Sequence, residues 1–240
     1  MIRLAFLVGL AVLAGPASAQ DQAFTLPDDG TLALRSIQII TLVTVLGIAP
    51  ALVIMITCFP FMVTVLSILR QAIGLQQSPP NMLMISLALF LTYFVMEPVF
   101  QSAWTAGIDP VVNGGMAFED GFTAALRPFR AFMAGRIDGG TYDALAALRP
   151  DVMTGFNAET APLSVMVPSF MLSEIARAFE VGFLLFLPFL IIDLVVSAVL
   201  MSMGMMMVPP AIVSLPFKLA FFVVADGWSL ISSSLVQSYF

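Results

Sequence analysis

Hydrophobic residues dominate the C-terminal part of the chain, where one short turn-forming segment interrupts them. Phe183–Met203 is apolar apart from Asp193 and two serines, and Ala211–Ala225 is almost as apolar. The intervening segment GMMMVPP ends in two prolines, which lack N–H donors and do not fit inside an ordinary helix. Each arm approaches the ~20 apolar residues that a helix needs to cross a bilayer. The pattern predicts a helical hairpin with methionines at its tip.

A similar order of apolar arm, proline-containing turn and apolar arm occurs in the N-terminal half. No charged residue lies between Arg35 and Arg70. This stretch is too long for one simple span, so we expect a helix over about 37–58, kinked near Pro50, and a second helical piece that ends at Leu69.

A second pair of prolines separates this region from the next apolar helix. The segment GLQQSPPN (74–81) predicts a turn, Met82–Met96 predicts a helix, and Pro98 is expected to weaken or kink the end of that helix. Together with the C-terminal hairpin, these segments predict an all-α fold of membrane-associated helical hairpins with about four long apolar helices.

Residues 101–165 have a different composition, which predicts a small water-exposed helical insert. They contain seven acidic residues and four arginines, and many turn signals. Short amphipathic helices are expected over about 117–135 and 141–148. The segment RPFRAFM (127–133) places aromatic residues beside cations, which suits either a partner contact or a plain solvated connector. Arg70 in the preceding turn, read with the positive-inside rule, places the insert on the periplasmic side.

The first residues have the features of a secretory signal peptide. Arg3 supplies a positive charge, an apolar stretch follows, and Ala17-Ser18-Ala19 is a small-residue cleavage site. We expect cleavage between Ala19 and Gln20, and the alternative is an uncleaved N-terminal anchor. The chain is then organised as a signal peptide, an N-terminal hydrophobic hairpin, the insert and a C-terminal hydrophobic hairpin, over residues 1–19, 20–100, 101–165 and 166–240.

Composition and charge exclude several classes of function. Hydrophobic residues make up 60% of the chain and charged residues 10%, well below the ~25% charged residues of soluble domains, which indicates a membrane protein. The net charge of −6, without any Lys/Arg cluster, argues against nucleic-acid binding. The chain has no histidine, and Cys58 is its only cysteine, so we expect no cofactor, metal site or disulfide within the chain.

Charged residues within or beside the apolar segments are candidates for function, because a charge in hydrocarbon is costly unless it is paired or hydrated. Asp193 and Lys218 lie at similar depths from the turn and have opposite signs. They favour an ion pair within the hairpin or between subunits. Two alternatives are that both line a wet lumen without contact, or that they relay protons. The full set is Glu174, which has Arg177 at i+3 on an amphipathic helix predicted over 166–182, and Glu180, Asp193, Lys218 and Asp226.

Two pairs of residues match catalytic sites only superficially. Ser214 and Lys218 have the i, i+4 spacing of a Ser–Lys dyad and no other feature of one. Asp193 and Asp226 lack the sequence surroundings of an intramembrane aspartyl protease. We therefore expect that the chain is not an enzyme.

Met201, Met203 and Met205, Met206 and Met207 form a tight cluster at the predicted tip. Copper(I) binding is one interpretation, since thioethers are soft ligands, although no histidine or nearby cysteine assists. Plain core packing is a second interpretation. We favour a third, in which the last three methionines form a deformable apolar plug that seals a constriction and yields when something passes.

The C-terminal region resembles a known family. Residues 188–238 read PFLIIDLVVSAVLMSMGMMMVPPAIVSLPFKLAFFVVADGWSLISSSLVQS. This closely resembles the signature region of the FliP family of flagellar type III export-gate proteins, and MGMMMVPP and LPFK are its most specific elements. Further matches are LSILRQAIGLQQSPPN (66–81) and PSFMLSEIARAFEVGF (168–183). With the signal peptide, the resemblance extends over nearly the whole chain.

The resemblance implies a subunit of the flagellar protein export gate, in the bacterial inner membrane at the flagellar basal body. In this family about five copies assemble with partner gate proteins into a helical pore through which flagellar proteins are exported. The family's channel-closing methionine loop corresponds to Met205–Met207. Charges in the family's subunit contacts correspond to Glu174, Asp193 and Lys218.

Two departures from the family pattern remove cations. Phe61 stands where the family has an arginine, and Ala176 stands where it has a lysine, although Arg177 follows directly. Pro60 also favours a bend at this point. Two functions remain open: a gated protein-export pore, or a structural nucleus for rod and basal-body assembly that conducts nothing.

Overall fold

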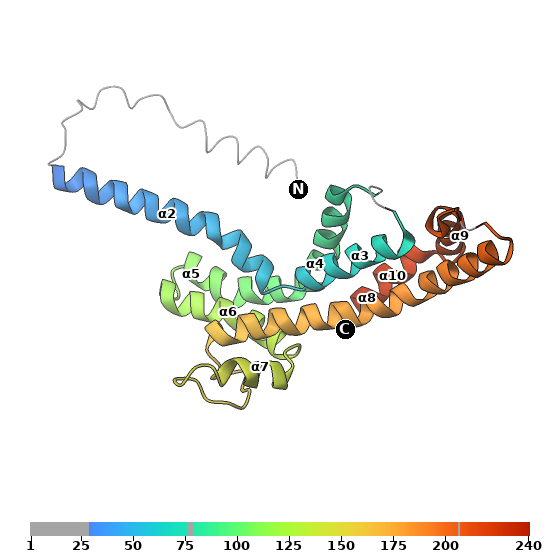
Figure 1. Cartoon of the computed structure of the whole chain (residues 1–240). Helices are drawn as coiled ribbons and strands as arrows, with labels where there is room; N and C mark the ends of the chain where they lie inside the picture. The colour runs from blue at the N-terminus through green and yellow to red at the C-terminus, as the bar shows by residue number, and fades with distance from the viewer. Residues whose placement is uncertain (1–28, 76–78, 206) are drawn as a thin grey trace, which may run out of the picture. The chain divides into compact units, whose positions relative to one another are not determined.

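A computed structural model describes residues 29–75, 79–205 and 207–240, and every regular element in these ranges is a helix (Figure 1). This confirms the predicted all-α fold. The cleavage site between Ala19 and Gln20 lies outside the described residues, and so does Met206. The chain divides into two compact units, Met1–Ala49 and Pro50–Phe240.

Helix α2 (Asp29–Met55) begins in the first unit and ends in the second. It starts earlier than the helix predicted over 37–58, ends earlier, and runs through Pro50. A proline removes one backbone hydrogen bond and is tolerated inside apolar helices. The window Arg35–Met55 is long and apolar enough to cross a membrane.

The second unit is built around α3 (Phe59–Ile73). The helical backbone is interrupted at Thr57 and Cys58, and α3 has Pro60 in its first turn. A proline fits there because N–H groups in the first turn of a helix have no carbonyl acceptor within the helix. The helix packs against α4 and α8, and its buried side chains form the centre of the largest hydrophobic cluster. The predicted second helical piece is confirmed, with its end at Ile73 rather than Leu69.

Helix α4 (Asn81–Ala103) continues beyond Pro98 into a π-helical turn, η1 (Trp104–Ile108), and then α5 (Asp109–Val112). The prediction that this helix ends near Met96 was therefore wrong. The single hydrogen bond that a proline removes did not end the helix, and the irregularity appears nearly two turns later as η1.

The insert contains α6 (Phe118–Ala134) and α7 (Gly139–Ala146), close to the predicted helices. Glycines allow η1 and α6 to approach closely. A Cβ built on Gly107 would lie 2.3 Å from the carbonyl oxygen of Gly121, so a side chain there would push the two helices apart.

The C-terminal hairpin consists of α8 (Leu163–Ser202) and α9 (Pro210–Val224), which lie side by side (Figure 1). The predicted amphipathic helix over 166–182 and the first apolar arm are one continuous helix of 40 residues. A further helix, α10 (Gly227–Gln237), was not predicted and is bent by 63° from α9.

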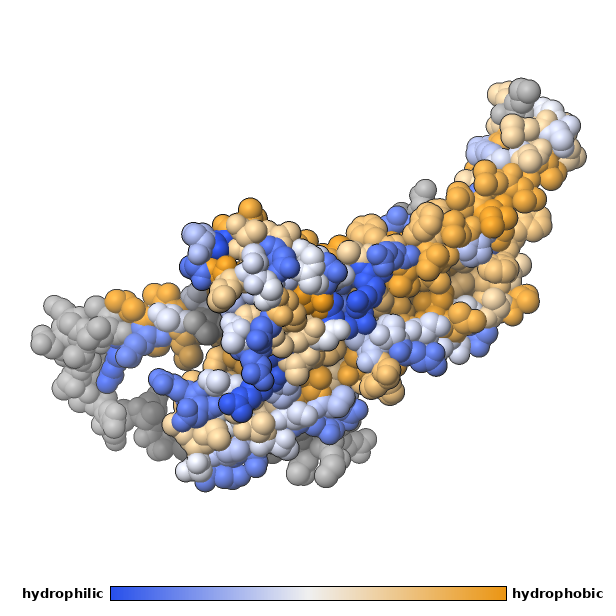
Figure 2. Space-filling model, turned by 90° about the horizontal axis from the view of Figure 1, so that it is seen from below, coloured by the Kyte–Doolittle hydropathy of each residue, from blue (hydrophilic) through white to orange (hydrophobic). Residues whose placement is uncertain are grey.

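The long apolar helices agree with the sequence prediction. Among the residues that the structure describes, three helical stretches are long and apolar enough to cross a membrane, and the bent pair of α9 and α10 makes a fourth if it forms one broken span. Hydrophobic residues cover the arm formed by the end of α8 and α9, whereas hydrophilic residues gather over the insert (Figure 2).

Candidate functional site

The tip of the hairpin is a turn whose geometry is fixed at both ends. Helix α8 closes with a Schellman motif, in which the N–H of Met205 donates to the carbonyl of Leu200 (3.0 Å) and the N–H of Gly204 donates to that of Met201 (3.1 Å). Gly204 has a φ of +73°, in the left-handed region that favours glycine. Helix α9 begins directly after Pro209. The turn is thus specified by glycine and proline.

The methionines of this tip are exposed in the single chain. Met207 is 97% exposed, and Met201, Met203 and Met205 are exposed as well. These methionines therefore do not pack in the hydrophobic core of the single chain. Unbranched thioether side chains that are free in one copy are available to pack against another surface.

Asp193 and Lys218 form an ion pair within one hairpin. The ammonium nitrogen of Lys218 lies 2.6 Å from Oδ2 of Asp193, and the hydroxyl of Ser214 donates to Oδ1 at 2.6 Å. The i, i+4 spacing of the serine and the lysine on α9 therefore lets both reach the same carboxylate on α8. The lysine side chain is 6% exposed and the aspartate side chain 32%, so one edge of the pair faces outward.

Lys218 also attaches the hairpin to α3. Its ammonium group donates to the carbonyl of Ala72 at 3.0 Å. Ala72 lies in the last turn of α3, which ends at Gly74 with a φ of +88°. The last carbonyls of a helix lack intrahelical donors and carry partial negative charge, so a cation is favourable there. One side chain thus links α8, α9 and α3.

Glu174 lies in a second cluster on α8 and is fully buried. Its Oε1 lies 2.8 Å from Nε of Arg136 and 3.5 Å from Nη1 of Arg177, and the hydroxyl of Tyr239 donates to its other oxygen, Oε2. Arg136 also donates to the carbonyl of Ser238 at 3.0 Å. This carboxylate connects the turn between α6 and α7 with α8 and with the segment that follows α10.

Aromatic rings complete the second cluster. The guanidinium of Arg136 lies 4.0 Å from the ring centre of Tyr239 and 5.8 Å from that of Phe61. Burial raises the pKa of the Tyr239 hydroxyl far above its usual range, and the Glu174 carboxylate raises it further. Burial likewise raises the pKa of Cys58 to about 12. Both groups therefore stay protonated at neutral pH.

The two positions that depart from the family pattern have different surroundings. Phe61 is fully buried and meets the ring of Tyr239 edge-on at 5.6 Å, so an apolar ring occupies the space beside the cluster. Ala176 is exposed on α8. Arg177, the next residue, contacts Glu174, as its i+3 spacing predicts.

Sequence patterns did not identify several members of these clusters. Glu174 binds Arg136 and Tyr239, which are far from it along the chain, and Arg136 in turn binds the distant carbonyl of Ser238. Ala72 contributes only a carbonyl. Helical spacing identifies contacts within an element, and all of these contacts are between elements.

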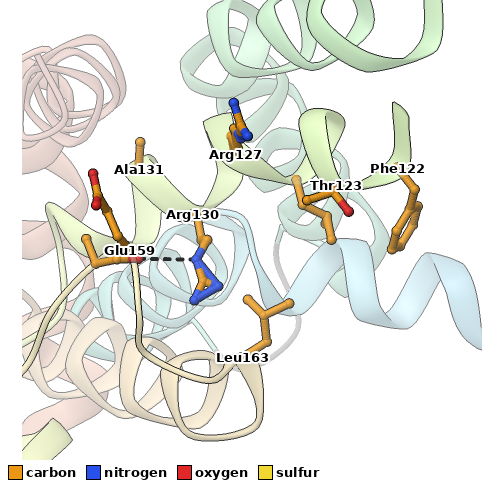
Figure 3. A pocket seen from close by; sticks show the side chains of 9 residues that line it. Phe122, Thr123, Arg127, Arg130, Ala131, Glu159 and Leu163 are labelled. Carbon is orange, nitrogen blue, oxygen red and sulfur yellow. Dashed lines mark hydrogen bonds between the residues drawn. The ribbon is translucent and has the colours of Figure 1, made fainter. Parts of the chain in front are cut away.

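The cation–aromatic segment 127–133 lines a cavity of about 860 Å³ beside α6 (Figure 3). Arg130 extends across it and donates to the carbonyls of Ala158 (3.2 Å) and Ala161, which fixes the loop that precedes α8. Arg127 and Glu159 lie on the wall of the same cavity. Arg130 therefore has a structural contact inside the insert.

Comparison with known proteins places these features in a family. The model of the FliP family matches residues 42–235. A protein of Caulobacter vibrioides named flagellar biosynthetic protein FliP is 49% identical over 239 residues, which cover 98% of this chain and 90% of the relative. Relatives of the same name from Rhizobium meliloti and Bacillus subtilis are 44% and 41% identical, over 100% and 85% of this chain and 100% and 92% of their own lengths.

Proposed function

The chain belongs to the FliP family, and from that premise we propose that it is a subunit of a gated pore for the export of flagellar proteins. About five copies of the chain assemble with other gate proteins into a helical pore in the bacterial inner membrane, at the flagellar basal body. The name shared by its relatives, flagellar biosynthetic protein, supports a role in building the flagellum. The pore and its gate are inferred from the methionine tip.

The observation that carries the proposal is the exposed methionine tip. Met205 and Met207 stand free on a turn set by Gly204 and Pro209. Several such tips around one axis would bring thioether chains together into an apolar constriction, which water and ions cross poorly. Each methionine has three rotatable torsions, so the plug can rearrange around an unfolded substrate and close again.

The two charge clusters support assembly in different ways. Asp193 keeps an outward edge, so a neighbouring subunit can add a donor to its carboxylate. Glu174 is enclosed and already accepts from Arg136 and Tyr239, so its effect on subunit contacts is indirect and passes through the shape of the chain. The apolar surface of the hairpin arm supplies the remaining contact area.

Convergence of the tips can be tested by disulfide cross-linking of the assembled complex. Cys58 is the chain's only cysteine and is buried, so Cys58→Ser gives a background without thiols. In that background Met207→Cys should give disulfide-linked dimers on oxidation in membranes. Val224→Cys, which is equally exposed at the other end of α9, is the matched control. An assembled complex in which Met207→Cys does not cross-link would contradict a converging tip.

The insert is proposed to face the periplasm. Arg70, near the turn that precedes α4, supports this orientation, because the positive-inside rule favours cationic residues on the cytoplasmic side, and the predicted signal peptide supports it as well. Asn113→Cys in the Cys58→Ser background places a thiol in an exposed turn of the insert. A membrane-impermeant maleimide should label this thiol in intact spheroplasts. Labelling only after lysis would put the insert in the cytoplasm.

A purely structural nucleus for rod and basal-body assembly is the second candidate, because the apolar hairpin surface suits a scaffold as well. The methionine tip separates the two functions. A scaffold needs no deformable plug. If the chain is only a scaffold, replacing the tip methionines should leave the ion permeability of the assembled complex unchanged.

A further inference from the structure

Tyr239 is enclosed by three separate segments of the chain. Its ring meets Phe61 of α3 edge-on at 5.6 Å and lies nearly parallel to Phe132 of α6 at 6.0 Å. The guanidinium of Arg136 covers the ring at 4.0 Å, and the hydroxyl donates to Glu174 of α8. The residue that follows α10 by two positions is therefore a junction between the insert, α3 and α8.

The neighbouring residue strengthens this junction. The carbonyl of Ser238 accepts a hydrogen bond from Arg136 at 3.0 Å, while Nε of the same guanidinium binds Glu174 at 2.8 Å. Asp138, next to the same turn of the insert, donates its backbone N–H to the hydroxyl of Ser173 on α8 at 3.0 Å. The segment after α10 is thus tied to an anchor that already holds the insert on α8.

At the other end of α10, the backbone bends sharply. Helix α10 leaves α9 at 63°, and Asp226 between them has a φ of +48°. In the part of the chain that the structure describes, this is the only non-glycine residue with a positive φ. A side chain in this region is strained, and such a conformation persists only where the surroundings hold it.

Apolar packing holds α10 at a few positions, where Ile231 and Leu235 join the largest hydrophobic cluster. Of its 11 residues, only Gly227, Ile231 and Leu235 are buried. Gly227 lies against the ring of Phe222, where a built Cβ would approach within 2.3 Å, so the elbow itself is tightly packed. The polar contacts of Ser238 and Tyr239 secure the far end of the helix.

We propose that Ser238 and Tyr239 form a latch that closes over Arg136 and Glu174 and holds α10 bent at Asp226. When the latch opens, the strained elbow is free to relax, and Tyr239 and the end of α10 move away from α3, α8 and the insert. Helix α9 keeps its place, because Lys218 attaches it to α8 and to α3. The latch therefore controls access to the buried residues of α3 around Phe61.

Cys58 is a built-in reporter of the latch. It is fully buried and lies one helical turn before Phe61, the residue on which the ring of Tyr239 packs. In the full chain, assembled with its partners in membranes, N-ethylmaleimide should label Cys58 slowly. Tyr239→Phe keeps the ring and removes only the hydroxyl that binds a buried carboxylate, and should raise the labelling rate by about tenfold.

Two further variants and a second measurement make the result decisive. Tyr239→Ala should raise the rate more than Tyr239→Phe, and Phe240→Ala, an exposed neighbour, should leave it unchanged. Amide hydrogen exchange should accelerate in α10 and stay slow in α3 and α8, which separates latch opening from unfolding. If Tyr239→Phe labels like the natural chain while Tyr239→Ala labels fast, a cavity explains the access and the latch is refuted.

Discussion

The two charge clusters on α8 differ in how completely they are enclosed. The carboxylate of Glu174 is fully buried and is shared by Arg136, Arg177 and Tyr239. Asp193, nearer the tip, keeps a side chain 32% exposed although its partner Lys218 is buried. The first cluster is closed within one chain, whereas the second has an open edge. The enclosed cluster around Glu174 stabilises the fold of a single chain, whereas the open edge of Asp193 is available to a neighbouring subunit.

Enclosure determines the cost of disrupting each cluster. A buried carboxylate without its cations, or a buried cation without its anion, loses most of its hydration and gains nothing in return. Where one partner reaches water, solvent screens the charge and reduces the loss. The predictions below rank the charged sites from the most enclosed to the most exposed.

The largest effect is expected at Glu174. Glu174→Ala leaves Arg136 buried without its anion and should cost ~3–5 kcal/mol, enough to lower the melting temperature of the purified chain sharply. Glu180→Ala, an exposed glutamate on the same helix, is the matched control and should melt like the natural chain. Equal melting of the two variants would mean that enclosure does not govern stability here.

An intermediate, coupled effect is expected at the second cluster. Asp193→Ala leaves Lys218 buried with only the Ala72 carbonyl and should cost about 1–3 kcal/mol. Lys218→Ala should cost less, because the aspartate reaches water. The double variant should cost less than the sum of the two single variants. Melting and complex assembly measure all three, and strictly additive losses would show that the pair is not coupled.

The smallest effect is expected at an exposed carboxylate, Asp138. It caps α7 by accepting the backbone N–H of Thr141 at 2.8 Å and its hydroxyl at 3.0 Å, and these bonds lower the pKa of Asp138. Its stabilising contribution is fully present above the ordinary pKa of 3.8 and is lost as the pH falls through the lowered value. Asp138→Asn keeps the cap without a charge, so the natural chain should lose slightly more stability on acidification. Parallel acid melting curves would show that the cap contributes nothing through its charge.

The sequence was sufficient where the chemistry is local. Two prolines and a glycine specify the tip, because their backbone limits act within a few residues. The length of the apolar segments was enough to predict the long helices. The opposite charges of Asp193 and Lys218 at similar depths anticipated a pair that the structure places within one hairpin.

The sequence was insufficient where contacts join distant segments. Tyr239 meets Glu174 across 65 positions and Arg136 meets it across 38, and no spacing rule covers such separations. Helix bounds near prolines were also misjudged. Pro98 lies inside α4, because a long apolar helix absorbs the loss of one hydrogen bond.

The barrier function of the methionine tip is the central claim, and ion permeability of the assembled complex tests it most directly. The variant Met205→Ala, Met206→Ala, Met207→Ala shortens the plug and leaves Gly204 and Pro209, which set the turn, in place. Reconstituted complexes of the natural chain should block small ions, and those of the triple variant should conduct them while assembling normally. Unchanged permeability in a fully assembled triple variant would contradict a methionine gate.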